Sequence, residues 1–224
     1  RGYRKGIAQA GGTFLLHNPV QEIRKGREGV FELELRDGTR VEAPKVLLAA
    51  GPWAGELGAK AGLDLPFAPE RHEAMITERM PRFFQPMLVD YRKDGCYFHQ
   101  LVSGQIIGCY SPWPQVPGIR EDVSVDFLPQ VAWRMSRLMP PLRHASFLRH
   151  WSGSYTMTPD GNPILDESPL EGFYVAGGMC GHGFMFGPAM GKRMADFMRT
   201  GSFGTDFSEF AYNRDFNAGK ESLK

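Results

Sequence analysis

The densest group of residues suited to ligand chemistry is GGMCGHG at residues 177–183, which holds four glycines, a cysteine and a histidine. The apolar residues 173–176 predict a buried strand before it, and residues 185–198 have helical spacing after it. Glycine allows close backbone approach, and a helix N-terminus offers free N–H groups and a positive dipole end. The run therefore predicts either a seat for an anion or electron-rich ring edge, or a tight connection without a ligand.

Length, charge and cysteine count narrow the class of protein. The 224 residues, 42% of them hydrophobic, can form one large domain or two small ones. Basic and acidic residues, 26 and 25, are well mixed, so no nucleic-acid surface is expected. Three widely spaced cysteines predict neither a disulfide framework nor a metal site, and they favour a reducing, cytoplasmic location. No apolar run approaches the ~20 residues that span a bilayer, so no transmembrane segment is expected.

The first residues have the pattern of an element entered partway. Residues 6–12 are typical of a helix end that closes on glycines, and residues 13–17 predict a strand. We therefore expect further residues upstream, or another polypeptide that supplies the first part.

The pattern of a partial α/β domain follows. Residues 20–24 and 30–35 alternate apolar and polar side chains, and Asp37-Gly38 predicts a hairpin turn after them. Residues 46–51 are apolar throughout and precede a helical segment, as strands of a buried parallel sheet do. Ligands bind at the carboxyl ends of such strands.

The middle of the chain predicts a mainly antiparallel sheet. Turn signals at Lys93-Asp94-Gly95 and Ser103-Gly104 separate its strands. The predicted elements are strands at residues 71–78, 87–91, 96–101 and 105–110, a loop at 111–120, a helix at 125–138 and a strand at 145–156. The predicted fold is mixed α/β: a partial Rossmann-like domain (residues 1–62 and 160–200), an inserted antiparallel sheet domain (63–159), and a C-terminal tail (201–224) with a short helix near residues 207–212.

Four stretches of the chain resemble segments of a known protein family. VLLAAGPW at residues 46–53 is similar to VVLAAGPWS of the D-amino-acid oxidase-like flavoproteins, the group of sarcosine and glycine oxidases and D-amino-acid dehydrogenases. In the family's order, PER at residues 69–71 resembles its PxR entry into the substrate sheet, and TPDGNP at 158–163 its TPDGxP turn. Residues 172–184 resemble its C-terminal FAD segment, GLYVATGHSGHGF. The family begins with G-x-G-x-x-G, which this sequence lacks, so we expect roughly 150 residues upstream.

The resemblance implies that the partial Rossmann-like domain binds FAD without a covalent bond, and that the inserted antiparallel sheet domain binds the substrate. Val20 would meet the adenine, and Gly153 stands where some relatives carry the cysteine that bonds to FAD. The residues implied near the phosphates and ribityl chain are Ala49, Ala50, Gly51 and Trp53. Those implied along the isoalloxazine ring are Gly178, Met179, Gly181, His182, Gly183 and Phe184. The helix that follows would direct its positive end at the ring and raise its reduction potential.

The reaction implied is oxidation of the C–N bond of an amine or amino acid, with hydride transfer to flavin N5. The implied catalytic residues are His182, Tyr155 and His150. The implied substrate-binding residues are Arg71, Tyr97, Trp151, Tyr155 and Met185. Met185 and Tyr155 replace the lysine and arginine that hold a carboxylate in relatives, so that cation could be Arg71, Arg149 or His150, or lie outside this chain. The aromatic side chains would suit an N-methylated amine, or could equally pack the sheet.

Two functions stay open. The first is a flavin-dependent oxidoreductase that acts on a small amine or amino acid. The second is a non-catalytic or assembly subunit that shares an FAD site with a second polypeptide. The missing nucleotide motif favours the second if the chain is naturally complete, and the intact glycine run at residues 177–183 favours the first.

Overall fold

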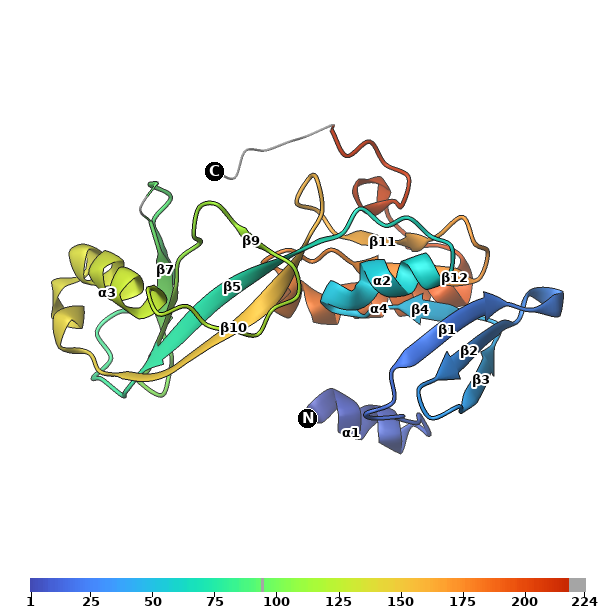
Figure 1. Cartoon of the computed structure of the whole chain (residues 1–224), viewed down its shortest axis with the longest axis horizontal. Coiled ribbons are helices and arrows are strands. Elements are labelled where there is room, and N and C mark those ends of the chain that lie inside the picture. Colours follow the sequence, from blue (N-terminus) through green and yellow to red (C-terminus); the bar gives the residue numbers. More distant parts are fainter. Residues whose placement is uncertain (94, 218–224) are drawn as a thin grey trace.

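The computed structural model describes residues 1–93 and 95–217, and its strands form three sheets (Figure 1). The first sheet is an antiparallel meander of β1 (Val20–Lys25), β2 (Phe31–Leu35) and β3 (Arg40–Ala43). The short helix η1 (Arg27–Gly29) joins β1 to β2. At the predicted hairpin, Gly38 takes a φ of 85°, and the Thr39 N–H donates to Asp37 Oδ1 over 2.9 Å. The alternation predicted for β1 and β2 is confirmed, because it buries Ile23 and Phe31 in one core.

The second sheet carries the parallel pair that the apolar run predicted. Its order is β11 (Ile164–Glu167), β12 (Phe173–Gly177), β4 (Val46–Leu48), with β12 parallel to β4 and antiparallel to β11. After β4 come η2 (Gly51–Trp53) and α2 (Ala54–Lys60), and after β12 comes α4 (Gly183–Thr200). Because β4 and β12 are parallel neighbours, with Leu48 beside Val175, the segments after them leave the same edge of the sheet.

Helices cover both faces of this second sheet. Phe173 and Val175 on one face share a core with Ala54 of α2, while Tyr174 on the other face packs against Met194 of α4. Helix α4 ends at Gly201, which has a φ of 74° and donates its N–H to Phe197 O. This two-sided layering is the arrangement expected of an α/β domain.

The third sheet is the predicted antiparallel one. Its strands are β5 (Ala68–Thr77), β6 (Leu88–Val89), β7 (Tyr97–Gln100), β8 (Ile106–Cys109) and β10 (Phe147–Met157), in the order β10-β5-β8-β7-β6, with β9 (Val116–Pro117) paired to β5. Helix α3 (Phe127–Leu138) and η3 (Pro140–His144) cover one face, where Val131 and Met135 pack on Met75 and Phe98. Figure 1 shows β5 and β10 running side by side from the α3 end of the molecule toward β11 and β12.

Two sequence expectations fail at the level of elements. Residues 13–17 form no strand, because no described strand pairs with them and Leu15 and Leu16 are half exposed. The helix before them, α1 (Gly2–Gln9), ends on glycines as predicted. The run at residues 46–51 is not buried throughout: β4 is an edge strand of its sheet, and Leu47 is 40% exposed.

The tail and one turn are described only in part. The predicted short helix is the 3-10 helix η4 (Ser208–Phe210). Asp94 of the predicted turn and residues 218–224 of the predicted tail lie outside the described residues. Within the described ranges, no helix combines the length and apolar character needed to cross a membrane.

Candidate functional site

Two turns meet at the carboxyl-end edge of the second sheet. The turn after β4 is open: Gly51 has a φ of 54°, and a side chain built there would meet nothing within 4 Å. Ala49 beside it is exposed, and Trp53 is half exposed. The implied FAD-contact residues of this turn are therefore accessible. Val20, the implied adenine contact, is partly buried against the core beneath the first sheet.

The turn after β12 is tightly packed on its inner side. Gly178 has a φ of 69°, and a Cβ there would lie 2.4 Å from Thr158 Cγ2 and 2.8 Å from Phe67 Cε1. A Cβ on Gly181 would lie 3.1 Å from Tyr155 Cε2. The glycines are required because the turn lies directly against the end of the third sheet.

Cys180 ties this turn to β10. Its N–H donates to Thr156 O over 3.1 Å, and its backbone takes a φ of 48°, which is rare outside glycine. The thiol is buried and lies 3.3 Å from Gly178 O. Cys180 is thus a small buried residue that holds the turn in place.

The N-terminus of α4 is left open. Its N-cap residue, His182, makes no side-chain cap hydrogen bond, and its ring lies 5.6 Å from that of Phe186. Phe184 is fully exposed and Met185 is 64% exposed. Unpaired N–H groups and the positive end of an 18-residue helix therefore face outward beside the glycine turn.

Three predicted site residues share one face of the third sheet. Tyr97 pairs with Cys109, Cys109 with Ala74 and Ala74 with Trp151, so these four side chains form one row across the sheet. Tyr155 follows on the same face of β10, and its hydroxyl lies 3.2 Å from that of Tyr97. Burial raises the pKa of Tyr97 well above its ordinary value, so this phenol stays protonated at neutral pH.

Two other predicted site residues lie on the opposite face of that sheet. Arg71 is 8% exposed and pairs with Glu73 at 3.0 Å and with Asp122 at 2.7 Å. His150 Nε2 lies 2.9 Å from Glu73 Oε2, and its ring stacks on Phe127 of α3. Arg71 and His150 therefore belong to a buried polar network under α3, away from Tyr97.

Glu70 and His72 lie on the same face of the third sheet as Tyr97 and Tyr155, and neither was among the predicted site residues. His72 faces Gly153 in the strand register, and Glu70 faces Tyr155. The imidazole of His72 stacks on the Tyr155 ring, with 4.0 Å between centroids. Burial lowers the pKa of His72 to about 4 and raises that of Glu70. The period of two in the strand predicted at residues 71–78 is the signal that places His72 and Arg71 on opposite faces.

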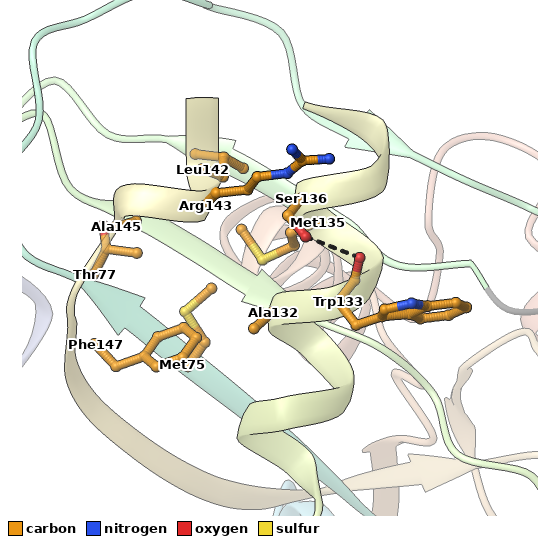
Figure 2. Close-up of a pocket in the computed structure, with 10 residues that line it drawn as sticks. All are labelled: Met75, Thr77, Ala132, Trp133, Met135, Ser136, Leu142, Arg143, Ala145 and Phe147. Atoms are coloured by element: carbon orange, nitrogen blue, oxygen red, sulfur yellow. Dashed lines mark hydrogen bonds between the residues drawn. The ribbon is translucent and has the colours of Figure 1, made fainter. Parts of the chain in front are cut away.

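A cavity of about 330 Å³ lies on the α3 side of the same sheet (Figure 2). Its lining residues are Met75, Thr77, Ala132, Trp133, Met135, Ser136, Leu142, Arg143, Ala145 and Phe147. In Figure 2 the indole of Trp133 points away from the other labelled side chains, and Arg143 extends from η3 toward Ser136 on α3. None of the predicted site residues lines this cavity, so it is separate from the two turns.

Side chains suited to a metal do not gather in the part of the chain that is described. No group of three or more His, Cys, Asp or Glu residues there could hold a metal ion. Cys96, Cys109 and Cys180 are free and buried, and burial raises the pKa values of Cys96 and Cys109 to about 11. These two thiols are therefore protonated at neutral pH and are poor metal ligands.

Two turns at the carboxyl-end edge of a parallel strand pair lie where α/β proteins bind their ligands. A family model for FAD dependent oxidoreductases (DAO) matches residues 1–197. The chain therefore belongs to the DAO family of FAD-dependent oxidoreductases, as the resemblance predicted.

Curated relatives of this chain are an amino-acid oxidase and an oxidase subunit, and the chain matches about half of the length of each. The chain is 30% identical over 210 residues to a glycine oxidase of Geobacillus kaustophilus, covering 92% of this chain and 54% of that one. It is 28% identical over 206 residues to the sarcosine oxidase subunit beta of Rhizobium meliloti, covering 90% and 48%. The chain thus spans about half the length of the curated relatives it matches.

Two solved structures share the fold of this chain over about half of their own length. The Geobacillus kaustophilus glycine oxidase aligns with a TM-score of 0.83 at 27% identity, over 93% of this chain and 55% of that chain. An L-proline dehydrogenase from P. horikoshii aligns with a TM-score of 0.84 at 26% identity, over 93% and 56%. The mixed α/β fold with an antiparallel sheet is therefore that of glycine oxidase structures over about half of their chains.

Proposed function

We propose that this chain supplies part of an FAD site and the substrate-facing sheet of an enzyme that oxidises a C–N bond in a small amine or amino acid. One observation carries the proposal: the open turn at Gly51 and the glycine turn at Gly178 leave the same edge of a parallel strand pair. The aromatic face of the third sheet ends against the second of these turns, through Tyr155 and Gly181.

The local geometry fits a flavin. Open space over Gly51 suits a phosphate or ribityl chain, and the uncapped start of α4 suits the electron-rich edge of a ring. FAD, when bound, would supply the acceptor for the hydride that leaves the substrate carbon. Non-covalent attachment is part of the proposal, because Gly153 offers no side chain for a bond and Cys180 is buried.

The chain's own residues would bind and orient the substrate. Tyr97, kept protonated by burial, donates a hydrogen bond at neutral pH, and Tyr155 beside it gives a second hydroxyl. Trp151 adds an aromatic wall in the same row of the sheet. His182 at the start of α4 lies beside the glycine turn, where it can hydrogen-bond a ligand.

The site needs more than the described residues contain. Leu47 on the edge strand β4 and Phe184 at the start of α4 are exposed apolar side chains, which favours cover by another segment. That segment would be upstream sequence or a second polypeptide, and it would hold the nucleotide motif. An assembly subunit that shares its FAD with a partner remains the second candidate, and a cytoplasmic location is proposed from the cysteine count.

The test is anaerobic reduction of the flavin in the purified protein, with any partner polypeptide retained. Glycine, sarcosine, N,N-dimethylglycine, L-proline and D-alanine are added in turn, and the flavin band is followed. Bleaching by at least one of them is the expected result. A bound flavin that none of them bleaches contradicts C–N oxidation of these substrates and favours the assembly role.

A further inference from the structure

His72 is a buried imidazole without a hydrogen-bond partner. Its side chain is 11% exposed, and neither ring nitrogen has a partner among the described residues. The nearest carboxylate oxygen, Glu70 Oε2, lies 3.9 Å from Nε2, beyond hydrogen-bond distance. Because neither ring nitrogen is paired, hydrogen bonding does not account for this imidazole, and its role must come from what the ring itself contacts.

The His72 ring stacks on Tyr155 in the neighbouring strand β10. The residue opposite on β10 is Gly153, and a Cβ there would meet nothing within 4 Å, so Tyr155 has room to lean over the imidazole. The two rings stack with centroids 4.0 Å apart and planes inclined by 22°. A Cβ built on Gly181 would lie 3.1 Å from Tyr155 Cε2, so the Tyr155 ring lies close to the glycine turn, and its hydroxyl lies 3.2 Å from that of Tyr97.

We propose that His72 is a positioning residue, whose imidazole supports the Tyr155 ring from behind and so fixes the Tyr155–Tyr97 hydroxyl pair against the glycine turn. This inference rests on the proposed function, because the hydroxyl pair is taken to meet the substrate. His72 itself does not touch the substrate. Without the stack, Tyr155 can rotate about χ1 and χ2 into the space over Gly153, and the two hydroxyls separate.

The test compares His72→Ala with His72→Phe in the purified holoprotein. Phenylalanine keeps a ring for Tyr155 to stack on and removes both nitrogens, whereas alanine removes the support. The probe is glycolate, a carboxylate without an oxidisable C–N bond, and its Kd is read from the change in flavin absorbance. His144→Phe, at an exposed position of η3, is the matched control.

His72→Ala is expected to raise the Kd of glycolate about tenfold or more. It should lower kcat by a similar factor with an amine that reduces the flavin, since small misplacements of binding groups carry such costs. His72→Phe is expected to stay within a factor of about three of the unchanged protein, as is the control. Unchanged binding in His72→Ala overturns the proposal. So does a His72→Phe variant as impaired as the alanine variant, because the nitrogens and not the stack would then carry the effect.

Failure of the proposed function is distinguishable from failure of this inference. If the protein takes up no FAD, the function fails and the stack is judged by an imidazole NMR titration. His72 is then expected to titrate near its lowered pKa of about 4 and to move toward its ordinary value in Tyr155→Ala, which uncovers it. An ordinary pKa for His72 in the unchanged protein overturns the stack. If FAD binds and amines reduce it while His72→Ala is normal, only the inference fails.

Discussion

The buried pair of Arg214 and Asp160 connects the tail to the turn before β11. Arg214 Nε and Nη2 donate to the two carboxylate oxygens of Asp160 over 2.7 and 2.9 Å, and both side chains are less than one-tenth exposed. Breaking such a pair leaves a buried charge alone, so Asp160→Asn is expected to lower the free energy of unfolding by about 3–5 kcal/mol. Urea denaturation at pH 7 measures it.

The same pair predicts how stability depends on pH. Burial raises the pKa of Asp160, but the hydrogen bonds and charge of Arg214, together with hydrogen bonds from Asn162 and Thr158, outweigh burial and hold this pKa below its ordinary value. The stabilisation is therefore complete above about pH 3.9 and is lost as pH falls through the lowered pKa. Asp196→Asn, in an exposed pair with Lys192, is the control, and its expected cost is only about 0.3–0.5 kcal/mol. Equal costs for the two variants would show that the tail does not pack here.

Arg71 and Tyr97 lie on opposite faces of the third sheet and should respond differently to substitution. Arg71→Gln breaks two ion pairs under α3 and is expected to destabilise the protein by about 3 kcal/mol or more, with little change in KM of the folded enzyme. Tyr97→Phe removes one hydroxyl, so it should cost about 1 kcal/mol of stability and raise KM. A large KM effect confined to Arg71→Gln would restore Arg71 as the carboxylate anchor.

Residue types and alternation predicted part of this site. Tyr97, Trp151 and Tyr155 could be placed on one face once the strands and their register were known. The burial of Arg71 could not be predicted from its strand alone, since its partner Asp122 lies in a loop about 50 residues away. His72 could have been separated from Arg71 by period, but its stack on Tyr155 depends on the space over Gly153.

At the scale of elements, the glycine turn after β12 tolerates substitution poorly. A methyl group at Gly178 would overlap Thr158 and Phe67, and the φ of 69° disfavours any side chain. Gly178→Ala is expected to destabilise the protein by about 1–3 kcal/mol and to weaken FAD retention, because the turn must move. Thermal unfolding and flavin released on dialysis measure the two effects.

Gly191 in α4 is the matched control for that substitution. A Cβ there meets nothing within 4 Å, and the residue has helical backbone, so Gly191→Ala should stabilise by about 0.5–1 kcal/mol. If Gly178→Ala behaved like this control, the turn would not be packed as described.

Element types were predictable where the periodic pattern was long, and less so elsewhere. The patterns of β2, α3 and β10 gave the elements that form. Residues 13–17 have strand-like side chains but no described strand beside them, and a strand exists only through its partner. For the same reason, the two faces and the edge of β4 could not be inferred from its apolar run.

At the scale of the whole molecule, the edge strand β4 is where we propose that another segment completes the site. Leu47→Lys is expected to destabilise the assembled holoprotein by about 2 kcal/mol or more, because a covering segment would bury this side chain. Val125→Lys is the control, since Val125 is 92% exposed at the far end before α3. Urea denaturation monitored by flavin release compares them, and equal, small effects would mean that nothing covers β4.

The most direct test of the account is the visible absorbance spectrum of the purified protein, taken beside its denaturing mass spectrum and after incubation with excess FAD. The account predicts flavin bands that survive gel filtration, together with polypeptide that supplies the nucleotide motif. Release of the flavin on denaturation would agree with non-covalent binding. A colourless protein that retains no FAD after this incubation would contradict the central claim that the turns at Gly51 and Gly178 are part of a flavin site.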